Sequence, residues 1–501
     1  MITPSTMSFN AKEVKVYLAG AGCGKTTALM GEMTELLKVY RPEEIAFVTY
    51  TKKGVAHGRE RALLACPELS NEDLIHFRTL HSLCFRELGL ASHNILSKKD
   101  MEEFNKLLGF NVTLAEGYEN QTDDDKLLIR YDALRSGSTK LTYTCGKYDE
   151  SRYKRLINAY EAFKKKTGTL DFYDCLLRFR ERNKPVSVKI AFIDEAQDLT
   201  LLQWEVCKIA FSKCEKVFIA GDDSQTLFSY QGASPETLIN LAGKYETVKH
   251  EKSYRLPEEV YRFSKGITGI IIDKVEKDFR PVKKDKGFVR DVGSRNFLGP
   301  VVLHDIKANG MTPYRWYFLF RNNCFMSETI DTLEGLMIPF HTPKGFCLDI
   351  RKLGKIKRYY NLRKKGFASP EAVEQFCKQY KINDINNDDF TDSELLPEAK
   401  KYIYYAYVEK FGIDALIEMA EKEPFLLLST VHKVKGGEAD FVAVFLDCTR
   451  KVFENLTNDY DEELRVLYVA CSRARNGLYL VQSKTKYGLD RVIDLVKEQV
   501  A

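Results

Sequence analysis

The chain has 501 residues, of which 44% are hydrophobic and 29% charged, and its formal net charge is +5. This composition is ordinary for globular protein and excludes a disordered or collagen-like chain. No run approaches the roughly 20 apolar residues of a membrane-spanning helix, and the N-terminal segment lacks the basic and apolar regions of a signal peptide. We therefore expect several folded domains without membrane attachment.

The charge balance and the cysteines exclude further classes. The chain has 76 basic and 71 acidic residues, so the net charge permits nucleic-acid binding without arguing for it. The 12 cysteines include no C-x-x-C pair, so the usual spacing of zinc and iron–sulfur sites is missing. We expect reduced and mostly buried thiols.

Short apolar runs alternate with helical stretches along the chain. The first strand is predicted at 14–18, followed by a glycine-rich turn and a helix at 26–38. Further strands are predicted at 45–50, 190–193, 217–220, 316–321, 425–430 and 441–446. This alternation is typical of parallel α/β sheets. Two stretches of different character, 92–150 and 344–424, are predicted to be inserted subdomains.

The glycine-rich turn at 19–27 reads Ala-Gly-Ala-Gly-Cys-Gly-Lys-Thr-Thr. Its glycines let successive backbone amides wrap a phosphate at the start of a helix. A P-loop usually begins with Gly where this chain has Ala19. The residues expected to bind the phosphates of ATP are Gly20, Ala21, Gly22, Cys23, Gly24, Lys25, Thr26 and Thr27.

A second carboxylate site follows the apolar strand at 190–193. Asp194 would come beside the P-loop, where it could hold Mg²⁺ together with Thr26. Glu195 suits a general base that orients and deprotonates a water molecule. The two segments together predict an ATP-hydrolysing enzyme.

The P-loop and the Asp-Glu-Ala-Gln-Asp segment resemble superfamily 1 DNA helicases of the UvrD/Rep/PcrA type. Further blocks resemble the motifs of this family in the same order, and they lie at 45–62, 77–88, 170–174, 221–233, 253–255, 428–441 and 462–474. The resemblance covers most of the chain apart from the two insertions.

The resemblance implies an α/β fold with two RecA-like parallel-sheet motor domains, each carrying an inserted, mainly helical subdomain. The first motor domain is expected at 1–91 and 151–248, with its insertion at 92–150. The second is expected at 249–343 and 425–501, with its insertion at 344–424.

The resemblance also implies roles for single residues at the nucleotide. Gln225 would sense the γ-phosphate, and Glu438 would face the ribose. Arg255 and Arg473 would act as arginine fingers from the second domain, where a delocalised cation stabilises charge on the transferring phosphoryl group. No Gln occurs in residues 1–18, where the family reads adenine, so selectivity for ATP over GTP is not predicted.

Single-stranded DNA would be bound by aromatic platforms and polar contacts. The residues that the resemblance places on the strand are Tyr50, Thr51, His81, Phe228, Tyr230 and His432. Tyr230 stands where the family commonly has Trp, and Gln231 where it commonly has Arg. The basic run at 351–365 is either a solvated face or a contact to duplex phosphates.

The function implied by the resemblance is an ATP-dependent DNA helicase that moves 3′ to 5′ on single-stranded DNA in replication or repair. An alternative is a translocase or clamp that remodels nucleoprotein without productive unwinding. Expected cofactors are ATP and Mg²⁺. Expected partners are single-stranded DNA, single/double-strand junctions and proteins of replication, repair or single-strand binding. The expected location is the cytoplasm, or the host cytoplasm for a viral protein.

Overall fold

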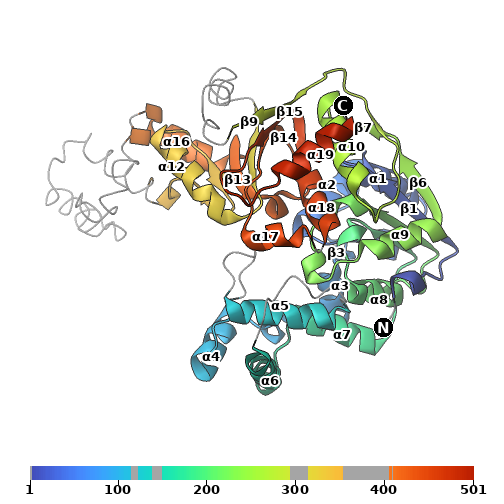
Figure 1. Cartoon of the computed structure of the whole chain (residues 1–501). Coiled ribbons are helices and arrows are strands. Elements are labelled where there is room, and N and C mark those ends of the chain that lie inside the picture. Colours follow the sequence, from blue (N-terminus) through green and yellow to red (C-terminus); the bar gives the residue numbers. More distant parts are fainter. Residues whose placement is uncertain are drawn as a thin grey trace, which may run out of the picture. The chain divides into compact units, whose positions relative to one another are not determined.

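A computed structural model of the chain describes residues 3–113, 122–137, 149–293, 314–351, 353, 406–408, 410–457 and 459–500 (Figure 1). Two compact units emerge from the contacts within it. The first unit consists of Met1–Phe288, Lys451–Ser472 and Val492–Ala501. The second unit consists of Val289–Arg450 and Arg473–Arg491.

The first unit is built on a six-stranded parallel sheet. Its strands, in the order in which they pair, are β3 (Phe77–Thr79), β2 (Ile45–Thr49), β4 (Ile190–Ile193), β5 (Lys216–Gly221), β1 (Glu13–Ala19) and β6 (Glu246–His250). A separate parallel pair joins β7 (Lys252–Ser253) to β8 (Arg280–Pro281). The P-loop strand β1 therefore lies inside the sheet, beside β5.

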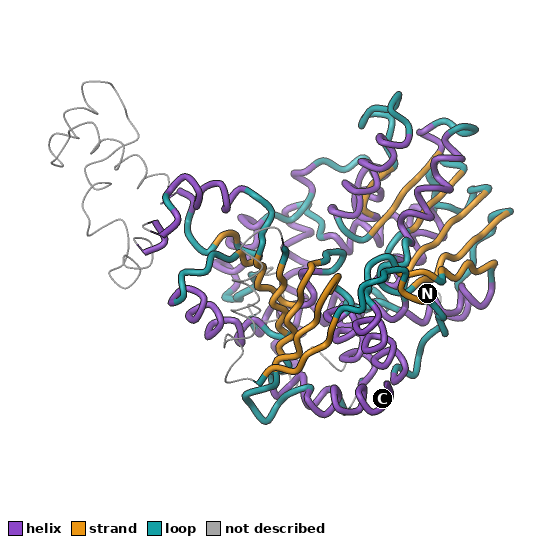
Figure 2. The backbone as a smooth tube through the Cα atoms, turned by 90° about the horizontal axis from the view of Figure 1, so that it is seen from above, coloured by secondary structure: helices purple, strands orange, loops and turns teal. Residues whose placement is uncertain are grey.

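Helices cover both faces of this sheet (Figure 2). They are α1 (Lys25–Leu37), α2 (Lys52–Ala65), α3 (Leu80–Glu87), α7 (Phe172–Arg182), α8 (Leu201–Ala210) and α9 (Pro235–Lys244). Helices α1 and α2 contribute to the core on one face, and α3, α7, α8 and α9 contribute to the core on the other. The unit also contains α10 (Glu258–Ile270), α18 (Tyr460–Cys471) and most of α19 (Asp490–Val500).

Burial on both faces explains why these strands are continuous apolar runs. Successive side chains of a strand point to opposite faces. In β4, Phe192 packs in the core under α1 and α2, whereas Ile193 packs in the core under α3, α7 and α8. The same alternation places Phe218 and Ile219 of β5 in different cores.

Three helices between β3 and α7 form a small core of their own. These are α4 (Lys98–Leu108), α5 (Asp123–Arg135) and α6 (Glu150–Thr167). The insertion predicted at 92–150 stops at the start of α6, yet Leu156, Tyr160 and Phe163 of α6 pack in this core. The compact insertion therefore extends past the predicted boundary, because the apolar face of α6 covers α4 and α5.

The second unit contains a seven-stranded sheet. The strands pair in the order β12 (Gly345–Phe346), β11 (His341–Thr342), β13 (Leu426–Thr430), β10 (Trp316–Phe320), β14 (Ala439–Phe445), β15 (Ala474–Val481) and β9 (Phe288–Val292). The central strands from β13 to β15 are parallel. Trp316 and Phe320 are fully buried and stack on aromatic rings of β14. The α/β class with a parallel sheet and a further sheet is thus confirmed.

The described helices of the second unit are α12 (Ser327–Gly335) and α16 (Ile413–Glu421), whereas α17 (Arg450–Asn455) belongs to the first unit from Lys451 onward. Leu348, Leu353, Tyr407 and Leu416 form a small core beside this sheet. Most of the insertion predicted at 344–424 lies outside the described residues. The same holds for the basic run at 351–365 apart from Arg351 and Leu353, and therefore for its two tyrosines.

The compact units divide the chain differently from the predicted domains. Residues 249–288 and α18 were expected in the second motor domain, but they belong to the first unit. Hydrogen bonds explain the difference, because Ser253 Oγ donates to Ala21 O (2.8 Å) and the Ala21 amide donates to Tyr468 Oη (2.9 Å). The motor-domain boundaries themselves stay a prediction.

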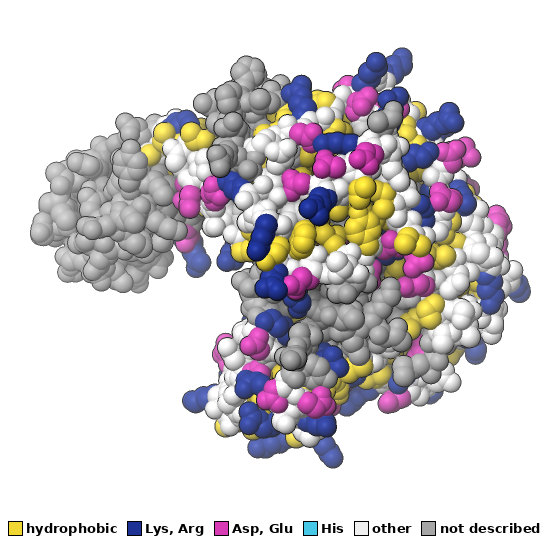
Figure 3. All heavy atoms as spheres, in the orientation of Figure 1, with side chains coloured by type: hydrophobic (Ala, Val, Ile, Leu, Met, Phe, Trp, Pro, Cys, Tyr) yellow, Lys and Arg dark blue, Asp and Glu magenta, His cyan; other side chains and the backbone are white. Residues whose placement is uncertain are grey.

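Two surface features bear on the environment of the protein. Across the described part of the chain, no helix combines the length and the apolar character needed to cross a bilayer. Lys and Arg side chains are interspersed with Asp and Glu on the face seen in Figure 3, as the near-balanced composition suggests.

We predict that Phe192→Ala destabilises the first unit by about 3–5 kcal/mol, the usual cost of emptying a buried phenylalanine site. Phe192 is fully buried and stacks on Phe218 with the ring centroids 4.9 Å apart. Urea unfolding can be followed through Trp204 in a Trp316→Phe background, because the chain has two tryptophans.

Val39→Ala is the matched control, since Val39 is 78% exposed. It should change the free energy of unfolding by less than about 0.5 kcal/mol. Equal stability of the Phe192→Ala variant and this control would contradict the packing described for β4.

Candidate active site

The turn between β1 and α1 has the backbone of a phosphate-binding loop. Gly22 and Gly24 adopt φ of 72° and 73°, the left-handed region, and Gly24 is the N-cap of α1. A Cβ at Gly22 would lie 2.4 Å from Cβ of Arg255, so a side chain is excluded there. The 13-residue helix α1 directs its free amides and the positive end of its dipole into the turn.

Lys25 is held at the mouth of this turn. Its Nζ donates to the carbonyl oxygens of Ala19 (2.9 Å) and Gly20 (3.3 Å), and it lies 3.8 Å from Oδ2 of Asp222. These partners are weak competitors for a polyphosphate, whose charge-assisted hydrogen bonds are stronger. Lys25 is therefore placed to bind a phosphate group.

Asp194 and Thr26 come together across the edge of the sheet. Asp194 directly follows β4, and its Oδ2 accepts a hydrogen bond from Thr26 Oγ1 at 3.2 Å. Burial, reinforced by the negative charge of Glu195, raises the pKa of Asp194 to about 7. A hydroxyl and a buried carboxylate are hard oxygen ligands that fit Mg²⁺. The charge of the ion would offset the free-energy cost of keeping the buried carboxylate ionised.

Glu195 stands in a strained conformation next to this pair. Its φ of 53° lies in the left-handed region, which is uncommon for a residue with a side chain. Its backbone amide donates to Asp194 Oδ1 (2.9 Å), and its Oε2 accepts from Gln197 Nε2 (2.6 Å). The strain and the two hydrogen bonds fix the direction of the carboxylate.

Gln197 joins the segment after β4 to the segment after β5. Its Oε1 accepts a hydrogen bond from the amide of Asp222 at 3.1 Å, while its Nε2 holds Glu195. Asp222 in turn accepts from Gln225 Nε2 at 2.7 Å. The expected base and the expected γ-phosphate sensor are therefore parts of one buried network.

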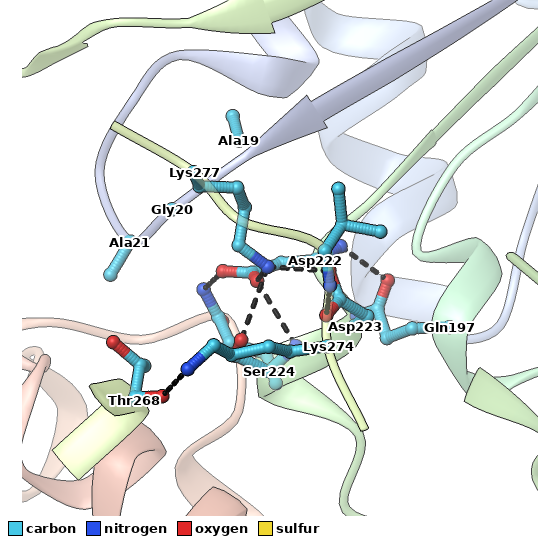
Figure 4. A network of polar contacts seen from close by, with 12 residues as sticks. Ala19, Gly20, Ala21, Gln197, Asp222, Asp223, Ser224, Thr268, Lys274 and Lys277 are labelled. Carbon is cyan, nitrogen blue, oxygen red and sulfur yellow. Dashed lines mark hydrogen bonds and ion pairs between the residues drawn. The ribbon is translucent and has the colours of Figure 1, made fainter. Parts of the chain in front are cut away.

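Asp222 lies in the network of polar contacts drawn in Figure 4, and it is charged although it is buried. Burial alone would raise its pKa, but Lys277 and Lys25 hold the pKa below its usual value. Lys277 Nζ donates to Asp222 Oδ1 at 2.8 Å and also contacts Asp223 and Ser224. The carboxylates after β5 thus have cations from two different segments of the chain.

Arg255 lies in the same unit as the P-loop. The amide of Tyr254 donates to Gly22 O (3.0 Å), and Arg255 Nη1 lies 3.5 Å from Ser472 O. The expectation that this arginine comes from the second domain therefore differs from the structure, because β7 follows β6 closely and is tied to the turn. Arg255 is nevertheless adjacent to the phosphate loop, as its expected role requires.

Arg473 and Glu438 directly precede β15 and β14, which are neighbouring strands of the second unit. Arg473 is 1% exposed, and its Nη1 donates to Gly437 O at 3.1 Å. Glu438 forms an ion pair with Arg475. A pocket of about 410 Å³ is lined by Arg315, Glu438, Ala439, Asp440 and Arg475.

Two of the expected DNA contacts are stacked on each other. The rings of Tyr50 and Phe228 lie 5.0 Å apart at an angle of 28°, and Tyr50 Oη donates to Gln231 Oε1 at 2.9 Å. Both aromatic side chains are partly exposed. Thr51 Oγ1 caps α2 by accepting from the amide of Gly54, and the side chain of Tyr230 lies outside the described residues.

The two histidines expected at the strand are neutral near pH 7. Burial lowers the pKa of His81 to about 4, and burial lowers the pKa of His432 to about 3, with help from neighbouring cations. His81 packs edge-on against Phe172, which is 61% exposed. An exposed aromatic side chain in a block that resembles a helicase motif was a signal that sequence analysis did not use.

Other residues at the site were not predicted from the sequence. Arg61 Nη1 donates to Thr27 Oγ1 of the P-loop at 2.9 Å, and Tyr468 accepts from the Ala21 amide. Both lie in blocks recognised as motifs, but charge and polarity alone did not distinguish them from their neighbours. Lys277 lies in no recognised block.

Comparisons with known proteins match two parts of the chain to helicase domains. Residues 6–246 match the model of the UvrD/REP helicase N-terminal domain, and residues 425–481 match that of the UvrD-like helicase C-terminal domain. Together these matches span more than half of the chain.

Relatives carry corresponding names. A "Probable DNA helicase II homolog" of Mycoplasma pneumoniae is 24% identical, over 94% of this chain and 82% of the relative. A "Probable DNA helicase" of the same organism is 27% identical over 53% of this chain and 54% of the relative. The "ATP-dependent DNA helicase Rep" of Escherichia coli is 26% identical over 48% and 39%. Because the N-terminal and C-terminal domain models both match, in this order along the chain, the chain belongs to the UvrD/Rep helicases.

Proposed function

We propose that this protein is an ATP-dependent DNA helicase that moves along single-stranded DNA from 3′ to 5′ and separates duplex. The observation that carries the proposal is the meeting of Thr26, Asp194, Glu195 and Gln225 beside the P-loop. A simple ATP-binding module needs no oriented base. The names of the relatives support DNA as the track.

ATP would bind with its phosphates on the amides of the P-loop and on Lys25. Thr26 and Asp194 would hold Mg²⁺, which when bound supplies positive charge to the phosphate oxygens. We assign the ribose to Glu438. Residues 1–18 contain no Gln, so the base of the nucleotide is not part of the proposal.

Hydrolysis would use Glu195 as general base. The carboxylate takes a proton from a water molecule while the oxygen of that water bonds to the γ-phosphorus. The bond between the γ-phosphorus and the β–γ bridging oxygen breaks, which gives ADP and inorganic phosphate. Gln225 would sense the γ-phosphate through its link to Asp222. Arg255 and Arg473 would stabilise the charge that spreads over the γ-phosphoryl oxygens.

The DNA strand would run over Tyr50, Phe228 and Tyr230, with polar contacts from Thr51, His81 and His432. The stacked pair of Tyr50 and Phe228 supports this assignment, because base stacking on aromatic side chains binds any sequence. Single/double-strand junctions are the expected substrate. Proteins of replication, repair or single-strand binding are the expected partners.

Strand displacement on tailed duplexes tests the proposal. Duplex DNA with a 3′ tail should be unwound with ATP, whereas 5′-tailed and blunt duplexes should not be. Unwinding from the 5′ tail would contradict the polarity. ATP hydrolysis with protein displacement but no strand separation would favour the remodelling translocase, and RNA duplexes show whether DNA is the track.

We predict that Glu195→Gln keeps nucleotide binding and loses hydrolysis, because the shape remains and the base is removed. Lys25→Ala should weaken both binding and turnover. Steady-state ATPase assays and binding of an ATP analogue measure the two effects. Glu43→Gln on the exposed surface is the control, and wild-type turnover by Glu195→Gln would refute the assignment.

We predict that Arg473→Ala lowers ATP turnover on the order of 10³-fold, as removal of other arginine fingers does. Affinity for DNA without nucleotide should change far less. Arg473→Lys keeps the charge but not the planar fork, so it should rescue folding more than rate. Arg491→Ala, on the exposed start of α19, is the control, and a defect confined to DNA binding would move Arg473 to the strand.

We predict that Tyr230→Ala weakens affinity for single-stranded DNA by roughly ten- to a hundredfold, the value of one stacked base. It should also uncouple ATP hydrolysis from unwinding, since Tyr230 follows Gln225 on one short segment. Tyr230→Trp should be tolerated. A lowered melting temperature with unchanged DNA affinity would show instead that Tyr230 is a packing residue.

A further inference from the structure

Lys277 is a buried cation on a segment to which no helicase motif was assigned. Its side chain is 7% exposed, and it faces Asp222 and Asp223, which are fully buried (Figure 4). Its Nζ donates to Oδ1 of both aspartates and to Ser224 Oγ (3.1 Å). All three donor positions of the ammonium are thus used on one short segment after β5.

Two adjacent buried carboxylates require compensating charge. Burial alone would lower the pKa of Lys277, but the two aspartates raise it above its usual value, so the lysine is charged. Breaking a buried ion pair by removing one partner leaves an uncompensated charge, which costs more than the pair contributes. Asp222 would then interact more strongly with the other cation that stabilises its charge.

That cation is Lys25 of the P-loop. Its Nζ already lies 3.8 Å from Asp222 Oδ2, the same oxygen that accepts from Gln225 Nε2. Lys277 occupies the other oxygen, Oδ1. The two lysines therefore share one carboxylate, and the position of Asp222 between them sets how strongly it attracts Lys25.

We propose that Lys277 is a positioning residue for ATP hydrolysis, which neutralises Asp222 and Asp223 so that Lys25 stays available to phosphate and Gln225 stays fixed. This inference rests on the proposed function. Lys277 would touch neither ATP nor the attacking water, and would act through the carboxylates of Asp222 and Asp223.

The segment that carries Lys277 is fixed at its start by α18. Asp461 accepts hydrogen bonds from the amides of Ile272 (3.0 Å) and Asp273 (2.9 Å), and Arg465 Nη2 donates to Asp273 O (2.6 Å). Further along, the amide of Val275 donates to Asp223 Oδ2 at 2.9 Å. The backbone that leads to Lys277 is therefore held at several points before it.

Lys274 offers a matched control on the same segment (Figure 4). Its Nζ donates to the carbonyl oxygens of Thr268 (2.8 Å) and Gly269 (3.2 Å) at the end of α10 and pairs with Glu276. Lys274→Met removes the same charge as Lys277→Met and makes the same change to the side chain. It leaves the contacts of Asp222 and Asp223 intact.

The test compares Lys277→Met, Lys277→Gln, Lys277→Arg and Lys274→Met in the full chain. Binding of AMP-PNP with Mg²⁺ is measured by calorimetry, and DNA-stimulated ATPase gives kcat and KM. Lys277→Met and Lys277→Gln should weaken AMP-PNP binding and lower kcat by about tenfold each. Lys277→Arg should recover most of both losses, and Lys274→Met should match wild type.

A second-site variant separates positioning from folding. Asp223→Asn combined with Lys277→Met removes one of the two unpaired carboxylates, so AMP-PNP affinity should return toward the wild-type value. A merely structural lysine would lower the melting temperature and the active fraction without moving KM or AMP-PNP affinity. That result, or equal losses in Lys274→Met, would overturn the inference.

The ATPase activity of the wild-type protein tests the proposed function separately from the role of Lys277. Absence of DNA-stimulated ATPase in wild type would contradict the proposed function. AMP-PNP binding would still decide the role of Lys277, because it requires no hydrolysis. If neither neutral variant folds, Lys277→Arg and Asp223→Asn remain, and an AMP-PNP affinity of Lys277→Arg as weak as that of Lys25→Ala would overturn the inference.

Discussion

Three carboxylates are buried at one edge of the first sheet, and the need to compensate their charge organises the site around them. Asp194 follows β4, and Asp222 and Asp223 follow β5, because parallel strands end at the same edge. Lys277 and Lys25 compensate the negative charge that follows β5. Asp194 accepts hydrogen bonds from Thr26 and the Glu195 amide. Its raised pKa shows that its charged form is disfavoured, and a bound Mg²⁺ would stabilise that form. The edge therefore combines the groups that our proposal assigns to a divalent cation and a polyphosphate.

Gln197 makes this edge a single unit. It bonds Glu195 through one end of its amide and the backbone of Asp222 through the other. A shift of Asp222 on nucleotide binding would therefore move Glu195, the proposed general base, as well as Gln225. The P-loop is connected to α18 in the same way, through the hydrogen bond from Ala21 to Tyr468. Such shared partners give a physical route by which nucleotide state can reach the segment of Phe228 and Tyr230.

The sequence predicts the parts of this protein whose signal is local. The strands at 14–18, 190–193 and 217–220 occur within a residue of their predicted ends, because burial on both faces demands continuous apolar runs. The P-loop turn is predicted by its glycines. Contacts between distant segments are different: Lys277 reaches Asp223 across 54 positions, and nothing in its polar surroundings marks it. The position of Arg255 beside Gly22 is another contact between distant segments. It depends on two hydrogen bonds that join Ser253 and Tyr254 to the turn.

The central claim is that the buried carboxylate edge of the first unit is an ATPase site driven by DNA. The most direct measurement is the steady-state rate of ATP hydrolysis with and without a single-stranded oligonucleotide. The account predicts hydrolysis that requires Mg²⁺ and rises severalfold or more when the oligonucleotide is added. A rate at background, or one that does not respond to DNA, would contradict it.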